Sequence, residues 1–139
     1  MTLKNIVGCL LDVAKTKPNI RTTGEGNVYD LNSKPDVVYN CFYVTQMGSD
    51  VYENQVHHKL TLFYIDRLTD NFDNKLQVQS NGQMEITNII NTVCNICDVE
   101  VDYPISFTSF NERFTDDCCG VFTTVTFITD LELGNCGYE

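Results

Sequence analysis

Apolar side chains recur with helical spacing in two parts of the chain. The first set follows the i, i+3, i+4, i+7, i+11 rule, ends before Pro18 and comprises Leu3, Ile6, Val7, Leu10 and Ala14. The second set follows the same rule and comprises Ile86, Ile89, Ile90, Val93, Cys94 and Cys97. Ser80 and Gln83 have the spacing of a capping box ahead of the second set. Two amphipathic helices are predicted, the second beginning near residue 80.

Segments rich in β-branched and aromatic residues predict four strands. Residues 37–47 and 55–67 form a long hairpin if Gly48-Ser49-Asp50 makes the turn. Residues 99–108 alternate apolar and polar positions, and a β-rich run at 121–131 follows a loop. The order is α-β-β-α-β-β. The expected fold is α+β, with both helices packed on one face of an antiparallel or mixed four-stranded sheet.

A polar, turn-rich stretch at residues 18–35 is expected to be a long loop within a single domain spanning 1–139. Long structureless loops are uncommon inside compact domains and often have a function. This one carries Arg21 and Lys34, so we expect it to be a contact arm.

Charge is distributed unevenly along the chain. Nine basic residues face nineteen acidic ones, for a net charge of -10, and from residue 77 onward Arg113 opposes ten carboxylates. A surface built from that half repels phosphate, which argues against tight nucleic-acid binding but is compatible with the lining of a DNA passage. A solvated acidic surface that serves solubility is the alternative. No apolar run approaches the ~18 to 20 residues of a membrane span, so no membrane partner is expected.

The seven cysteines are an odd number, which predicts a reducing compartment and no disulfide framework. Cys94 and Cys97, together with Cys118 and Cys119, have the residue types of a tetrahedral zinc site. The helical spacing of the first pair instead favours core-facing residues. A zinc-bearing adaptor therefore stays an alternative, and no metal is the expectation.

Motifs for catalysis are absent from the sequence. There is no Gly-x-Ser-x-Gly elbow and no Gly-x-x-x-x-Gly-Lys phosphate loop. His57 and His58 are neighbours in a predicted strand, where side chains alternate between faces, so they cannot chelate one metal together. We expect no enzyme and no cofactor.

Three segments resemble proteins of the tailed-phage neck. Residues 107–127, following a helix with Gln79-Ser-Asn-Gly-Gln and Asn88-Ile-Ile, look like the closing half of tail-terminator or neck proteins. Residues 62–71, Leu-Phe-Tyr-Ile-Asp-Arg-Leu-Thr-Asp-Asn, are similar to a strand of tail-completion proteins of Bacteroides-infecting, crAss-like phages. The resemblance covers most of residues 36–131.

The resemblance implies a tail-terminator-like fold and a structural virion protein, assembled in the host cytoplasm. It would form a ring, hexameric by expectation, at the head-tail neck beside connector and tail proteins, with a channel through which DNA passes during genome ejection. Subunits of such a ring present two different complementary patches. The candidate intersubunit contacts are Arg21, Lys34, Met47, Asp50 and Tyr52. The candidate channel-lining residues are Glu100, Asp102, Asp116 and Asp117. A small α+β binding or adaptor module is the alternative.

Overall fold

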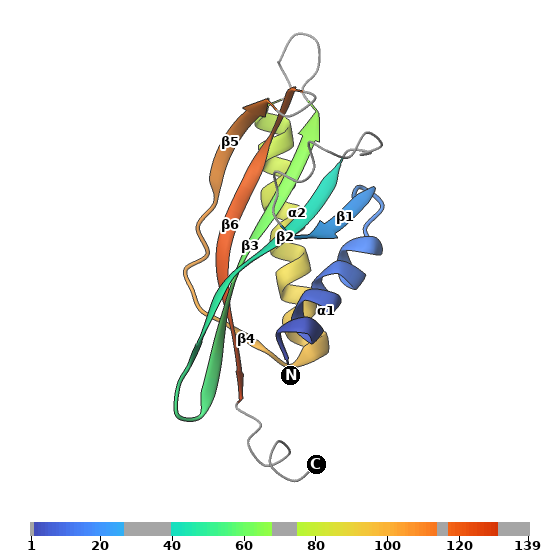
Figure 1. Cartoon of the computed structure of the whole chain (residues 1–139). Helices are drawn as coiled ribbons and strands as arrows, with labels where there is room; N and C mark the ends of the chain where they lie inside the picture. Colours follow the sequence, from blue (N-terminus) through green and yellow to red (C-terminus); the bar gives the residue numbers. More distant parts are fainter. Residues whose placement is uncertain (1, 27–39, 68–74, 114–116, 131–139) are drawn as a thin grey trace.

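The computed structural model describes residues 2–26, 40–67, 75–113 and 117–130, which form two helices and a mixed sheet (Figure 1). The elements are α1 (Leu3–Lys15), β1 (Thr22–Glu25), β2 (Cys41–Val51), β3 (Gln55–Arg67), α2 (Lys75–Cys97), β4 (Glu100–Val101), β5 (Thr108–Arg113) and β6 (Asp117–Asp130). The prediction of an α+β fold with two helices is confirmed. The sheet has six strands rather than four, in the order β1-β2-β3-β6-β4, with β5 also paired to β6.

Strand β1 lies inside the stretch that was expected to be a loop. Thr22 pairs with Cys41 and the strand runs parallel to β2, which makes the sheet mixed. Gly24 permits this pairing, because a Cβ there would stand 2.6 Å from Cε1 of Tyr43. A four-residue edge strand has too few positions to show alternation, so the polar composition concealed it. The rest of the expected loop, residues 27–35, lies outside the described residues.

The β2–β3 hairpin is confirmed, but its predicted turn is wrong. Gly48 lies within β2, at a register shift between Gln46 and Gly48, with φ 144°. This positive φ favours glycine, and such a bulge bends and twists the strand. The chain reverses later, where the Tyr52 N–H donates to the Gln55 carbonyl at 2.7 Å. The glycine marks a bulge in a strand that continues to Val51.

The C-terminal strands also differ from their predicted bounds. The expected strand 99–108 is reduced to β4, and Pro104 follows shortly after it. Pro104 has no N–H to donate to a neighbouring strand. The stretch expected to be a loop between the strands instead contains paired β5 and β6 residues, such as Phe110 opposite Gly120. A Cβ at Gly120 would stand 1.8 Å from the Tyr64 carbonyl oxygen, so this position requires glycine.

Both helices cover the same face of the sheet, as expected. The buried face of β3 carries Leu60, Leu62 and Tyr64, and it packs in one core with α1 and α2. The helix residues of this core are Ile6, Leu10, Val13, Ala14, Val78, Ile86, Ile89, Ile90 and Val93. Helix α1 begins at its cap, where the Thr2 hydroxyl accepts the Asn5 N–H at 3.2 Å. No helix of the described residues is long and apolar enough to cross a membrane.

Helix α2 begins at Lys75, before the predicted capping box. Its apolar stripe extends backward through Gly82 and Val78, which lie one and two turns before Ile86. At Gly82 the helix approaches the sheet closely: a Cβ there would stand 2.7 Å from Cγ2 of Val121 and 2.9 Å from Cδ1 of Tyr64. Burial of Val78 and Gly82 therefore outweighs the local capping signal.

Candidate interaction surfaces

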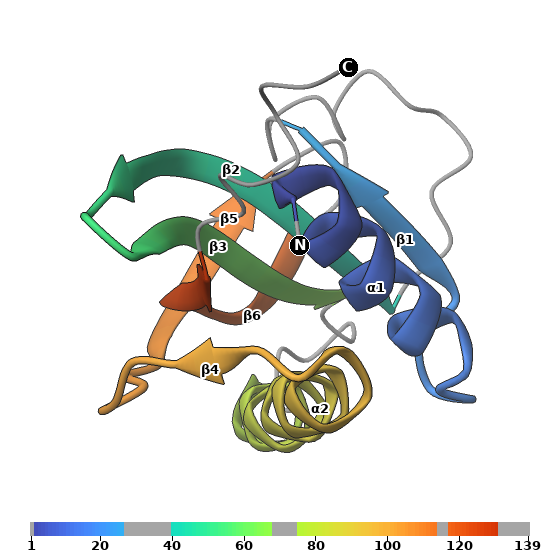
Figure 2. The ribbon, with the colours of Figure 1, turned by 90° about the horizontal axis from the view of Figure 1, so that it is seen from below.

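The end of the β2–β3 hairpin, residues 46–56, projects away from the helices, and we call it the arm (Figure 2). Its tip, residues 47–54, exposes three large apolar side chains: Met47 is 58 %, Val51 69 % and Tyr52 53 % exposed. Asp50 is exposed as well. Beyond the end of β1, this part of β2 has no partner strand on its outer edge among the described residues. The arm thus offers an apolar tip and an open strand edge.

Contacts with His57 and His58, which follow the arm on β3, hold its tip in place. The ring centroids of Tyr52 and His57 are 4.4 Å apart. On the opposite face, the buried His58 has its Nδ1 3.0 Å from the Ser49 hydroxyl and its Nε2 3.5 Å from the Thr129 hydroxyl, which ties the arm to β6. Burial is the largest cause that lowers the pKa of His58, and the nearby His57 adds to it. The neutral imidazole is therefore the form that the fold favours.

A groove of about 630 Å³ runs between α1 and α2. It is mostly apolar, and a Cβ added at Gly8 would have no atom within 4 Å. The 67 % exposed Ile96 of α2 lies along it. We call this surface the groove, and its lining residues are Lys4, Asn5, Gly8, Cys9, Asp12, Val13, Thr16, Thr92 and Ile96. No sequence pattern pointed to it, because it depends on how far apart the helices lie.

An acidic hollow of about 390 Å³ lies where β4 meets the end of β6. Glu100 lines it together with Asp98 and Asp130, two carboxylates that the sequence analysis did not single out. The exposed Asp102 follows directly, with its N–H donating to the Thr126 carbonyl at 3.1 Å. The pairing of β4 with β6 brings these acids together, because Glu100 lies opposite Ile128 and Asp130 follows two residues later.

The predicted channel-lining residues do not form one cluster. Asp117 begins β6, eleven residues before Ile128, which is about 37 Å along an extended strand. Asp117 therefore lies at the opposite end of β6 from Glu100 and Asp102. Asp116 lies outside the described residues.

The predicted intersubunit residues also fall into separate places. Arg21 is exposed just before β1, where its N–H donates to the Asn40 carbonyl at 2.9 Å. Met47, Asp50 and Tyr52 lie on the tip, at the other end of β2. Lys34 lies outside the described residues. The structure thus groups three of the five on one surface.

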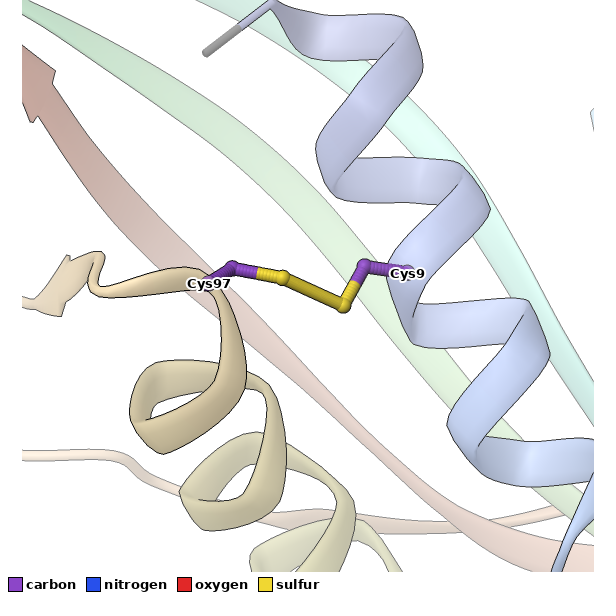
Figure 3. The surroundings of a disulfide bond; sticks show 2 residues. All are labelled: Cys9 and Cys97. Atoms are coloured by element: carbon purple, nitrogen blue, oxygen red, sulfur yellow. A yellow bond between two sulfur atoms is a disulfide. The ribbon is translucent and has the colours of Figure 1, made fainter.

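Cys9 of α1 and Cys97 of α2 form a disulfide that joins the two helices (Figure 3). The sequence predicted no disulfide framework, and this bond corrects that prediction. The sequence could not reveal the pair because 88 positions separate the two cysteines. With Cys97 bonded, the four-cysteine zinc arrangement loses a ligand. Burial raises the pKa of the free Cys94 thiol, which disfavours the thiolate that a metal needs. Among the residues described, no three metal-binding side chains cluster.

The Ser49–His58 contact is the arrangement nearest to a catalytic pair in the described part of the chain. A nucleophilic serine requires a histidine that a third group orients, usually a carboxylate. Here the second ring nitrogen faces the Thr129 hydroxyl, and the imidazole is buried. The contact is a structural tie between the arm and the rest of β3, and the absence of enzymatic activity stays a prediction.

Comparisons with known proteins leave the family open. No family model matches the chain, and a search of curated proteins finds no match either.

Proposed function

We propose that this protein is a structural virion subunit that assembles with copies of itself into a ring at the phage neck, of tail-terminator or tail-completion type. The ring, sixfold by the resemblance, surrounds a channel for DNA and contacts connector and tail proteins. The neck location is supported by the sequence resemblance of residues 62–71 and 107–127. Self-assembly is supported by the arm.

The single observation that carries self-assembly is the exposed apolar tip. Met47, Val51 and Tyr52 are each more than half exposed, and all three belong to residues 47–54 at the end of the hairpin. Apolar side chains collected on a projection mark a surface that another molecule covers, because leaving them in water costs ~25 cal/mol per Å² of apolar area. In a structural protein that forms rings, the neighbouring subunit is that molecule.

Channel lining is assigned to the acidic hollow and to Asp102. Four carboxylates, those of Asp98, Glu100, Asp102 and Asp130, lie at one end of β6. Such a surface repels the phosphates of DNA and lets the genome move without sticking.

Reversing Glu100 and Asp102 to lysine should slow or stop genome ejection in the assembled particle. Glu25→Lys is the control, since Glu25 is exposed on β1. Normal ejection from the double variant would overturn the channel role.

Native mass spectrometry and negative-stain electron microscopy test the ring itself. The wild-type protein should form a closed oligomer with a central hole, and the triple variant Met47→Ser, Val51→Ser, Tyr52→Ser should remain monomeric. The matched control is Leu76→Ser with Met84→Ser, which removes comparably exposed apolar side chains from α2 and should leave the ring intact. A wild-type monomer at every concentration would overturn the proposal.

The groove favours a second candidate function, a small binding module that accepts an apolar segment of another protein. An apolar groove between two helices suits an inserted side chain or helix. A strict monomer that captures a heterologous partner in the groove would favour this function over the ring.

A further inference from the structure

We infer that the tip of one subunit docks into the groove between α1 and α2 of the next subunit. The inference rests on the proposed self-assembly and names the surfaces that would carry it. In this contact the exposed apolar side chains of the tip lie against the apolar groove of the neighbouring subunit.

The groove has the chemistry and the room that the tip requires. Its lining is mainly apolar, its volume is about 630 Å³, and the missing side chain at Gly8 leaves open space above α1. Val13 contributes to the wall, and the exposed Ile96 forms part of the rim. Tyr52 is the natural anchor, because aromatic residues in fully desolvated pockets supply most of the binding energy at protein interfaces.

The charges around the two surfaces are complementary. The tip carries Asp50 and Glu53 and no basic residue. Residues 2–21, which contain α1, carry four basic residues against the single acidic Asp12, a net charge of +3 in a chain whose total is -10. Lys4 and Asp12 both lie in the groove lining, and the other three basic residues lie elsewhere within residues 2–21. The acidic tip of a second copy is thus attracted to Lys4 and to the net positive charge of residues 2–21, of which α1 is the main part.

The arrangement of the two surfaces points to a second copy. The arm extends away from both helices, so its tip does not enter the groove of its own subunit (Figure 2). A contact between two different patches is heterologous, and repetition of such a contact around an axis closes a ring. The same surfaces would therefore serve every junction of the assembly.

Blocking the groove tests the inference. Gly8→Phe places a ring where a Cβ has no neighbour within 4 Å, so the subunit should fold normally and its self-association should weaken at least tenfold in sedimentation equilibrium. Gly8→Ala is the matched control and should associate like the wild type. If Gly8→Phe forms the wild-type oligomer, the docking inference is overturned while the ring proposal stands. If the wild-type protein does not self-associate at all, the proposed function fails and the docking inference fails with it.

A charge exchange provides a second test that does not depend on Gly8. Lys4→Glu places a carboxylate opposite the acidic tip, and the repulsion should weaken association about tenfold. The loss should be larger at low salt than at high salt, because salt screens the charges. Adding Glu53→Lys in the same chain should restore most of the loss. If the double variant associates no better than Lys4→Glu alone, the pairing of these two surfaces is overturned.

Discussion

The imidazole of His57 lies against the ring of Tyr52 at the base of the tip, with the ring centroids 4.4 Å apart and the planes inclined by 52°. This contact restricts an aromatic side chain that is otherwise half in solvent. A side chain ordered before binding loses less conformational entropy when a partner covers it. The pair therefore prepares Tyr52 for docking.

His57→Ala should weaken self-association by about two- to tenfold, the range expected when an aromatic pair worth ~0.5 to 1.5 kcal/mol is lost. The free energy of unfolding of the monomer should change little, because His57 is only half buried. Sedimentation equilibrium measures the first quantity and urea denaturation the second. Lys59→Ala, an exposed change on the same strand face, is the control. If His57→Ala and Lys59→Ala associate equally well, the claim that His57 orders Tyr52 for docking is contradicted.

Buried His58 should make folding stability depend on pH. Burial lowers the pKa of His58 below 6.5, so as the pH falls through about 6.5 the unfolded chain takes up a proton that the folded protein resists. The free energy of unfolding should therefore fall as the pH is lowered from ~7.5 to ~5. Urea denaturation of His58→Gln at several pH values should show a flatter dependence than that of the wild type. An unchanged slope in His58→Gln would refute this account.

Two helical glycines should respond oppositely to the same substitution. Gly82→Ala forces a Cβ to within 3 Å of Val121 and Tyr64 and should destabilise the fold by about 1 to 3 kcal/mol through overpacking. Gly8→Ala meets no atom and should stabilise it by up to ~1 kcal/mol through helix propensity. Chemical denaturation of both variants measures the difference. Destabilisation by Gly8→Ala would show that the groove is filled within the monomer.

The Cys9–Cys97 disulfide should stabilise the oxidised protein by about 2 to 4 kcal/mol, because it closes a long loop in the unfolded chain. A reductant should lower the denaturation midpoint of the wild type by a corresponding amount. Cys9→Ser should have the lower denaturation midpoint even without reductant, and adding reductant should not change it. A wild-type midpoint that does not respond to reductant would contradict this contribution.

The sequence predicted the core of this fold well because the core has a period. Ile86, Ile89, Ile90 and Val93 showed the buried stripe of α2. Features that depend on pairing between residues far apart in the sequence were not predicted. Strand β1 is stabilised by the parallel register with Cys41 rather than by its own composition, and Gly48 was interpreted as a turn although it occupies a bulge.

The candidate surfaces were predictable only where they are local. Met47, Asp50 and Tyr52 follow one another along the hairpin, so its tip could be named from the sequence. The groove and the acidic hollow combine residues that are far apart in the chain, as Gly8 with Ile96 and Glu100 with Asp130. Only the packing of α1 beside α2 and the register of β4 on β6 bring those residues together.

The central claim is that the arm joins one subunit to the next, and site-specific photo-cross-linking from position 52 tests it most directly. With Tyr52→p-benzoylphenylalanine, irradiation of the assembled protein should link two chains and give a ladder that ends at the ring size. The linked peptides should contain α1 or residues 92–96 of the neighbouring chain. Irradiated protein that stays monomeric, or cross-links confined to one chain, would contradict the claim.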